Sequence, residues 1–90
     1  MAFNSFYLGE TVPFSIEIRN AQSSDLVDPD SITITIQNNE VLVDNEDMIK
    51  DSVGVYHYDW ISSAIGTFQA IFKAVDNGKT SIAKDNVNIS

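Results

Sequence analysis

The chain contains no cysteine, so neither a disulfide bond nor a thiolate is available to it. Its stability therefore has to come from an apolar core. Ninety residues are enough for one such core, which predicts a single domain over residues 1–90. A hydrophobic content of 43%, with 10% aromatic residues, is typical of a packed globular protein rather than a disordered acidic segment.

Positive charge is also scarce, because five Lys and Arg residues stand against thirteen Asp and Glu residues, for a net charge of -8. Such a surface repels phosphate backbones and anionic lipid headgroups, so we expect no nucleic-acid partner. The apolar runs are far shorter than the roughly 20 residues that span a bilayer, and we expect no membrane insertion. The first residues carry neither a basic stretch nor a long apolar region, so this chain is predicted to have no signal peptide.

Motifs for catalysis and for cofactors are missing as well. There is no glycine-rich phosphate loop and no histidine cluster with metal-ligand spacing. The one histidine, His57, is expected to share a strand face with Asp59, and Ser52 is near it in sequence. No oxyanion loop or nucleophile turn accompanies these residues. We therefore predict no catalytic residue, no cofactor and no enzymatic activity.

What the chain does have is an alternation of apolar and polar residues with a period of two, which is typical of β-strands with one buried face. Three stretches show it clearly, with these inward residues: Val12, Phe14, Ile16 and Ile18; Ile32, Ile34 and Ile36; Phe68, Ala70, Phe72 and Ala74. Asn77-Gly78 predicts a tight hairpin turn before a last strand over residues 80–89. A slip in that strand's alternation predicts a bulge near Asp85-Asn86.

The middle of the chain is less regular. Residues 20–30 are polar and predict a loop, whose end carries Pro29. Asn38-Asn39 predicts a turn, followed by a short strand over residues 40–43 and a charged bend over residues 44–47. Residues 48–50 are expected to form a short strand or a bridge across one edge of the fold.

Aromatic residues follow two glycines in a repeated local pattern. Gly54-Val55-Tyr56 and Gly66-Thr67-Phe68 each place a glycine two residues before an aromatic residue. Each glycine is predicted to bend the backbone so that the aromatic side chain enters the core. The run that continues through Tyr58 to Trp60 should then form an aromatic inner face. The alternative is an outward face on which the rings stack against sugars.

Together, Leu8-Gly9-Glu10-Thr11-Val12, Val27-Asp28-Pro29-Asp30-Ser31 and the G-x-Y-x-Y-x-W run with its later G-x-F resemble prokaryotic and viral immunoglobulin-like domains. Macroglobulin-like and fibronectin-type sandwiches share this pattern. The resemblance implies an all-β, immunoglobulin-like sandwich of two antiparallel sheets with about seven strands. Antibody-type domains differ by their Cys-Trp-Cys core. Phe68 stands near the tyrosine-corner position and has no hydroxyl, which leaves Tyr56 or Tyr58 to supply an equivalent hydrogen bond.

Clustered carboxylates are the remaining candidates for a site. The densest group, Asp44, Glu46, Asp47 and Asp51, lacks the spacing of an EF-hand loop and is interpreted as a solvated bend. Asp25, Asp28 and Asp30 lie on one predicted loop and form the better calcium candidate. Turn formation and solubility explain the same three residues, so we assign no metal ligand and keep them only as that candidate.

These observations predict a non-catalytic structural or interaction module, in the virion of a phage or archaeal virus or on a cell surface. We expect a protein partner or self-assembly, through strand edges or end loops. The near-terminal Phe3, Phe6 and Tyr7 are expected to include contacts with a neighbouring subunit or domain. The alternative is a carbohydrate- or calcium-binding accessory module of an exported enzyme or adhesin.

Overall fold

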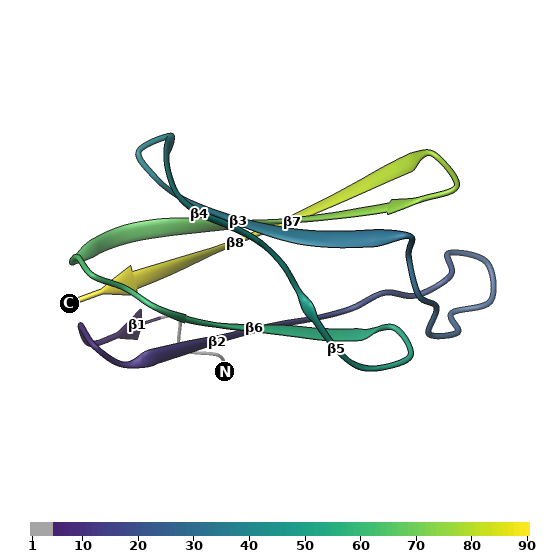
Figure 1. Cartoon of the computed structure of the whole chain (residues 1–90), viewed down its shortest axis with the longest axis horizontal. Helices are drawn as coiled ribbons and strands as arrows, with labels where there is room; N and C mark the ends of the chain where they lie inside the picture. The colour runs from purple at the N-terminus through teal and green to yellow at the C-terminus, as the bar shows by residue number, and fades with distance from the viewer. Residues whose placement is uncertain (1–4) are drawn as a thin grey trace.

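The computed structural model describes residues 5–90, and every regular element in that range is a β-strand (Figure 1). Eight strands occur, which is close to the expected number. They are β1 (Ser5–Phe6), β2 (Thr11–Glu17), β3 (Ser31–Asn38), β4 (Val41–Asp47), β5 (Ile49–Ser52), β6 (Val55–Ile61), β7 (Gly66–Asp76) and β8 (Lys79–Ile89).

The strands form two sheets that face each other as two layers in Figure 1. One sheet has five strands in the order β1-β8-β7-β3-β4, and the other has three in the order β2-β6-β5. All pairs are antiparallel except β1 with β8, which run parallel. The predicted all-β, sandwich-like arrangement is therefore confirmed, although one pair departs from the expected antiparallel sheets.

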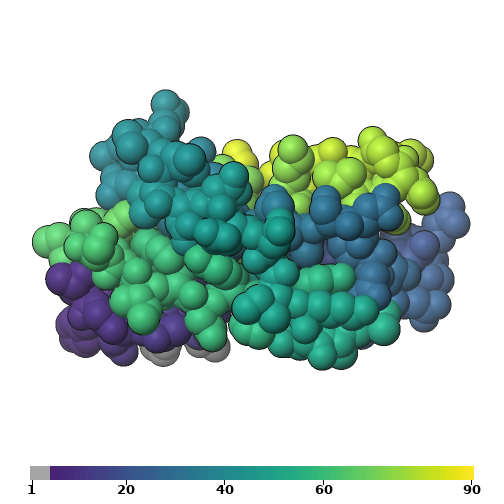
Figure 2. Space-filling model, viewed as in Figure 1, coloured from purple at the N-terminus to yellow at the C-terminus, as the bar shows by residue number. Residues whose placement is uncertain are grey.

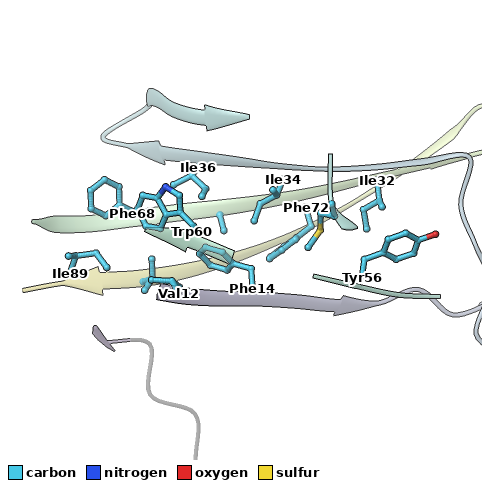
Figure 3. Packing of buried hydrophobic residues seen from close by; sticks show 13 residues of the cluster. Val12, Phe14, Ile32, Ile34, Ile36, Tyr56, Trp60, Phe68, Phe72 and Ile89 are labelled. Atoms are coloured by element: carbon cyan, nitrogen blue, oxygen red, sulfur yellow. The ribbon is translucent and has the colours of Figure 1, made fainter. Parts of the chain in front are cut away.

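The core fills the space between the inner faces of the two sheets (Figure 3). Ile34 and Ile36 of the larger sheet are 1% and 0% exposed, and Val12 and Phe14 of the smaller sheet are also buried. Aromatic rings join the layers, since the Trp60 ring meets the Phe68 ring edge-on with centroids 5.1 Å apart. The alternation predicted for these strands is confirmed.

A buried methionine lies at one of the places where the chain passes from one sheet to the other. Met48 lies between β4 of the larger sheet and β5 of the smaller one, is 7% exposed, and donates its backbone N–H to the Ile32 carbonyl. Its side chain fills the core at the crossing. The bridge or short strand expected at residues 48–50 is confirmed, with β5 extending to Ser52.

Three predictions about acidic and polar segments were wrong. Residues 44–47 are no bend, because they continue β4 and pair with β3, where Glu46 lies opposite Ile34. The turn before β4 has its positive φ angles at Asn39 and Glu40, one residue later than expected. The β7–β8 register is unbroken, so there is no bulge at Asp85-Asn86; a register shift lies instead between Ile36 and Gln37, where β3 pairs with β4.

The glycine and hairpin predictions were confirmed. Asn77 and Gly78 have φ angles of 51° and 71°, the left-handed pair that a tight hairpin turn requires. Gly54 and Gly66 also have positive φ angles, and the aromatic residues two positions later, Tyr56 and Phe68, are buried.

Truncation of a core isoleucine provides a test of this packing. Ile36→Ala should lower the free energy of unfolding by about 2–5 kcal/mol, because it leaves a cavity between the sheets. Ile82→Ala is the matched control, since Ile82 is 60% exposed on β8, and it should cost less than about 1 kcal/mol. Urea unfolding measures both; similar costs would contradict the two-sheet core.

Candidate functional site

Asp28 joins the β2–β3 loop to β5, β6 and the turn between them. Its Oδ2 atom accepts a hydrogen bond from Lys50 Nζ at 2.7 Å. Its Oδ1 atom accepts two more, from the Gly54 backbone N–H at 2.9 Å and the Tyr56 hydroxyl at 3.1 Å. Three donors that are 22 to 28 residues away in sequence therefore converge on one carboxylate.

These contacts set the protonation states of the group. The hydrogen bond from Lys50, followed by that from Gly54, lowers the pKa of Asp28, and the same hydrogen bond raises the pKa of Lys50. Burial, with the Asp28 contact adding to it, raises the pKa of Tyr56. At neutral pH the carboxylate is ionised and its partners keep their protons. The arrangement is a structural tie that includes the Tyr56 hydroxyl.

Gly54 is required by the same tie for steric reasons. Its φ angle is 72°, and a Cβ atom added there would lie 2.8 Å from the Ile18 carbonyl oxygen and 2.9 Å from both Leu26 Cβ and Val27 N. Its carbonyl also accepts the Ile18 N–H at 2.7 Å. Only glycine lets the β5–β6 turn approach the chain that leaves β2 this closely.

The three aspartates of the calcium candidate are not gathered into one site. Asp28 is held by the donors above, and Asp30 Oδ2 accepts the Asn77 N–H of the β7–β8 turn at 3.1 Å. Asp25 is exposed, and its carbonyl oxygen accepts the Asn20 N–H. Among residues 5–90, no group of three or more His, Asp or Glu side chains is arranged to hold a metal ion. The three residues instead bond to separate parts of the fold.

Asp44, from the predicted acidic bend, links the two sheets. Its Oδ2 atom on β4 accepts the Tyr58 hydroxyl of β6 at 2.6 Å. This hydrogen bond, with burial adding to it, raises the pKa of Tyr58 to about 12, so the hydroxyl remains a donor at neutral pH. Of the predicted acidic cluster, Asp44 therefore contacts β6, whereas Glu46, Asp47 and Asp51 are exposed.

His57 pairs with an aspartate of the neighbouring strand β5. Its Nδ1 atom lies 2.6 Å from Asp51 Oδ1 on β5, not against Asp59. Ser15 is directly opposite His57 on β2, so a serine, a histidine and an aspartate cross the outer face of the smaller sheet in one row. All three are at least partly exposed on a strand face, whereas nucleophilic catalysis requires donors aimed at an oxyanion in a site sheltered from water.

The aromatic residues of β6 point inward. Tyr56 and Trp60 are 7% and 6% exposed, and Tyr58 packs partly buried against the core (Figure 3). The inner-face prediction is confirmed, and these rings provide no outward platform for a sugar. Of the near-terminal residues, Phe6 packs against the core and Tyr7 is 73% exposed, while Phe3 is outside the described residues.

A groove of about 640 Å³ opens between the end of β2, the β2–β3 loop and the β7–β8 hairpin. Ile16, Ile32, Phe72 and Ala74 give it an apolar lining that continues the core. Glu17 and Arg19, also among its lining residues, pair with each other at 2.7 Å. The lining is therefore apolar beside the core, and Asp76 and Lys79 of the β7–β8 hairpin are among its charged residues.

Among residues 5–90, seven of the ten exposed large apolar side chains gather in two places; the other three are Ile49, Val53 and Ile82. At one end of the molecule, Ile61 lies opposite Thr11 at the start of β2. The Leu8 N–H donates to the Ser90 carbonyl, next to Ile89, which pairs with Gly66 at the start of β7. We call this group the apolar end; it consists of Tyr7, Leu8, Ile61 and Ile65, each at least half exposed. The second group is three consecutive exposed residues at the start of β4: Val41, Leu42 and Val43.

Comparisons with known proteins bear on the fold alone. No protein-family model and no curated protein matches the chain. Among solved structures, it is similar to the crystal structure of an engineered protein from the Northeast Structural Genomics Consortium, with a TM-score of 0.69 and 16% identity. The match covers 96% of this chain and 17% of that one, so the chain spans about a sixth of the engineered protein's length.

The described part of the chain holds no helical segment that could traverse a bilayer.

Substitution of two glycines with nearly the same φ angle distinguishes the cost of a steric clash from the cost of backbone strain. Gly78→Ala should cost about 1–2 kcal/mol, because its φ angle of 71° is unfavourable but nothing lies within 4 Å of the new Cβ. Gly54→Ala, at 72°, adds clashes with backbone atoms and should cost at least about 2 kcal/mol more. Chemical denaturation gives both values, and equal losses would show that Gly54 is not closely packed.

The tie at Asp28 predicts a pH dependence. Because its pKa is lowered in the folded protein, Asp28 stabilises the fold fully above the ordinary aspartate value, and this contribution is lost as pH falls through the lowered pKa. Asp28→Asn should therefore reduce the urea midpoint at pH 7, and the difference from the unmodified chain should close under acid conditions. Asp59→Asn, at an exposed residue, is the control; an equal effect of both substitutions would contradict the tie.

Proposed function

We propose that the chain is an immunoglobulin-like β-sandwich domain that acts as a non-catalytic structural module, holding proteins together in a virion or on a cell surface. The strand order supports this topology. The β2-β6-β5 sheet corresponds to strands B, E and D of such domains, and the β8-β7-β3 part of the other sheet corresponds to G, F and C. In that scheme β4 is the additional strand beside C, and β1 is a short first strand beside the last one.

The main support for this function is the position of the exposed apolar side chains. Isolated apolar residues on a surface need no explanation, whereas contiguous ones mark contact sites. Here they gather at the apolar end and at the start of β4. Meanwhile two of the acidic groups, Asp28 and Asp44, are engaged in structural hydrogen bonds with Lys50 and Tyr58. Contact with another protein is the function that this distribution favours.

A ligand-binding module is the competing function, and calcium and sugar binding can be tested directly. A calcium site filled to a hundred times its Kd would add about 2.7 kcal/mol and raise the melting temperature by about 10 °C or more. We expect a shift below about 1 °C at millimolar calcium, with magnesium as the control, and no reproducible binding on a glycan array. A clear calcium-specific shift or a bound sugar would overturn the proposal.

The proposed setting is tested by the genes around the coding sequence. We expect genes for virion assembly beside it, or an enclosing reading frame for a surface protein. An enclosing enzyme, together with a measurable hydrolase activity that His57→Ala abolishes, would contradict a non-catalytic role.

A further inference from the structure

The hairpins at the two edges of the five-stranded sheet carry opposite net charge. On one side, the β3–β4 hairpin has four acidic residues and neither lysine nor arginine; the four are Glu40, Asp44, Glu46 and Asp47. On the other, the β7–β8 hairpin has three lysines against two aspartates, in a chain whose net charge is -8. These lysines, Lys73, Lys79 and Lys84, form no ion pair within residues 5–90, whereas Arg19 and Lys50 are both paired.

Both sides also end in a strand with an open edge. Within residues 5–90, β4 pairs only with β3, and β8 pairs with β1 only at Asn88 and Ile89, which leaves residues 79–84 of β8 with β7 alone. Figure 2 shows the two hairpins at the upper left and upper right of the surface. An open edge is a template for another strand unless charge or shape prevents it.

Charge selects which edges can pair. Two β4 edges that pair antiparallel over residues 41–47 would place Asp44 opposite Asp44. They would also bring Glu46 and Asp47 of both copies into an interface without a lysine or arginine, and like charges close together are destabilising. A β4 edge beside a β8 edge brings acidic side chains against lysines. The favoured partner of β4 is therefore the β8 strand of a second copy.

The directions of the strands allow this pairing without reorienting either copy. Since β4, β3, β7 and β8 alternate in direction, β4 runs opposite to β8. A second copy in the same orientation thus presents its β4 antiparallel to β8 of the first. The order of residues along the two edges is then complementary. Lys79 lies beside the acidic half of β4, residues 44–47, and Ile82 lies beside its aliphatic half, residues 41–43. Lys84 lies beside the turn that carries Glu40.

We propose that copies of this chain associate head to tail, with β4 of one copy extending the five-stranded sheet of the next along residues 79–84 of β8. The inference rests on the proposed function and names its partner. Such a contact is heterologous, so each addition leaves one free β4 and one free β8. It is small and partly electrostatic, which predicts weak association that salt suppresses.

Two charge-reversal variants test the pairing by blocking one edge each. K79E/K84E blocks β8, and E46K/D47K blocks β4; each should sediment as a monomer at concentrations where the unmodified chain associates, from about 10 μM to about 1 mM. A mixture of the two variants retains one native pair of edges, β4 of the first with β8 of the second. Sedimentation velocity should therefore show association restored in the mixture, and lost again when salt is raised from about 0.05 M to about 0.5 M.

The double variant D25K/D59K is the control, because it changes net charge as E46K/D47K does, at exposed residues that belong to neither β4 nor β8. It should associate at least as well as the unmodified chain. Circular dichroism and thermal melting show whether each variant is folded. A monomeric unmodified chain at about 1 mM, blocked variants that still associate, or a folded mixture that stays monomeric would each overturn the pairing. Those results would leave the non-catalytic function standing, since only a ligand or an activity contradicts that.

Discussion

Burial of one apolar face from each sheet against the other is the constraint on which the rest of this structure depends. The chain has no disulfide, so the inward side chains of β2, β3, β6 and β7 provide most of its stability. To close that core, the chain has to cross between the layers after β4, and Met48 fills the crossing. The β2–β3 loop must then be held against the β5–β6 turn, which Asp28 and Gly54 accomplish together.

The same constraint limits what the protein can do. The rings of Tyr56 and Trp60 are committed to the core, and the hydroxyl of Tyr56 is used to hold a loop. The Ser15, His57 and Asp51 row lies across an open strand face. What is left for interaction with other molecules is the periphery: the apolar end, the aliphatic start of β4 and the charged strand edges. A module that acts by contact uses these features and requires no others.

Local sequence patterns predicted the buried strands, because alternation along β3 and β7 directly reflects which face is inside. They could not predict β4 beyond residue 43. An edge strand with little cover tolerates Asp44, Glu46 and Asp47 and so loses the alternation that identifies a strand. The partners of Asp28 could not be predicted either, since they are 22 to 28 residues further along the chain. The contact between His57 and Asp51 could not be predicted either, because Asp51 lies at the register shift between Lys50 and Ser52, where β5 pairs with β6.

Hydrogen exchange at low and high protein concentration tests the central claim most directly, because it reports on the core and on both edges in one experiment. At any concentration, the amides of β3 and β7 that pair within the larger sheet should exchange slowly. The amides of β4 and of residues 79–84 should gain protection together as concentration rises, while those of the β5–β6 turn should not change. Protection that stays constant at both edges, or that rises at only one of them, would contradict the account.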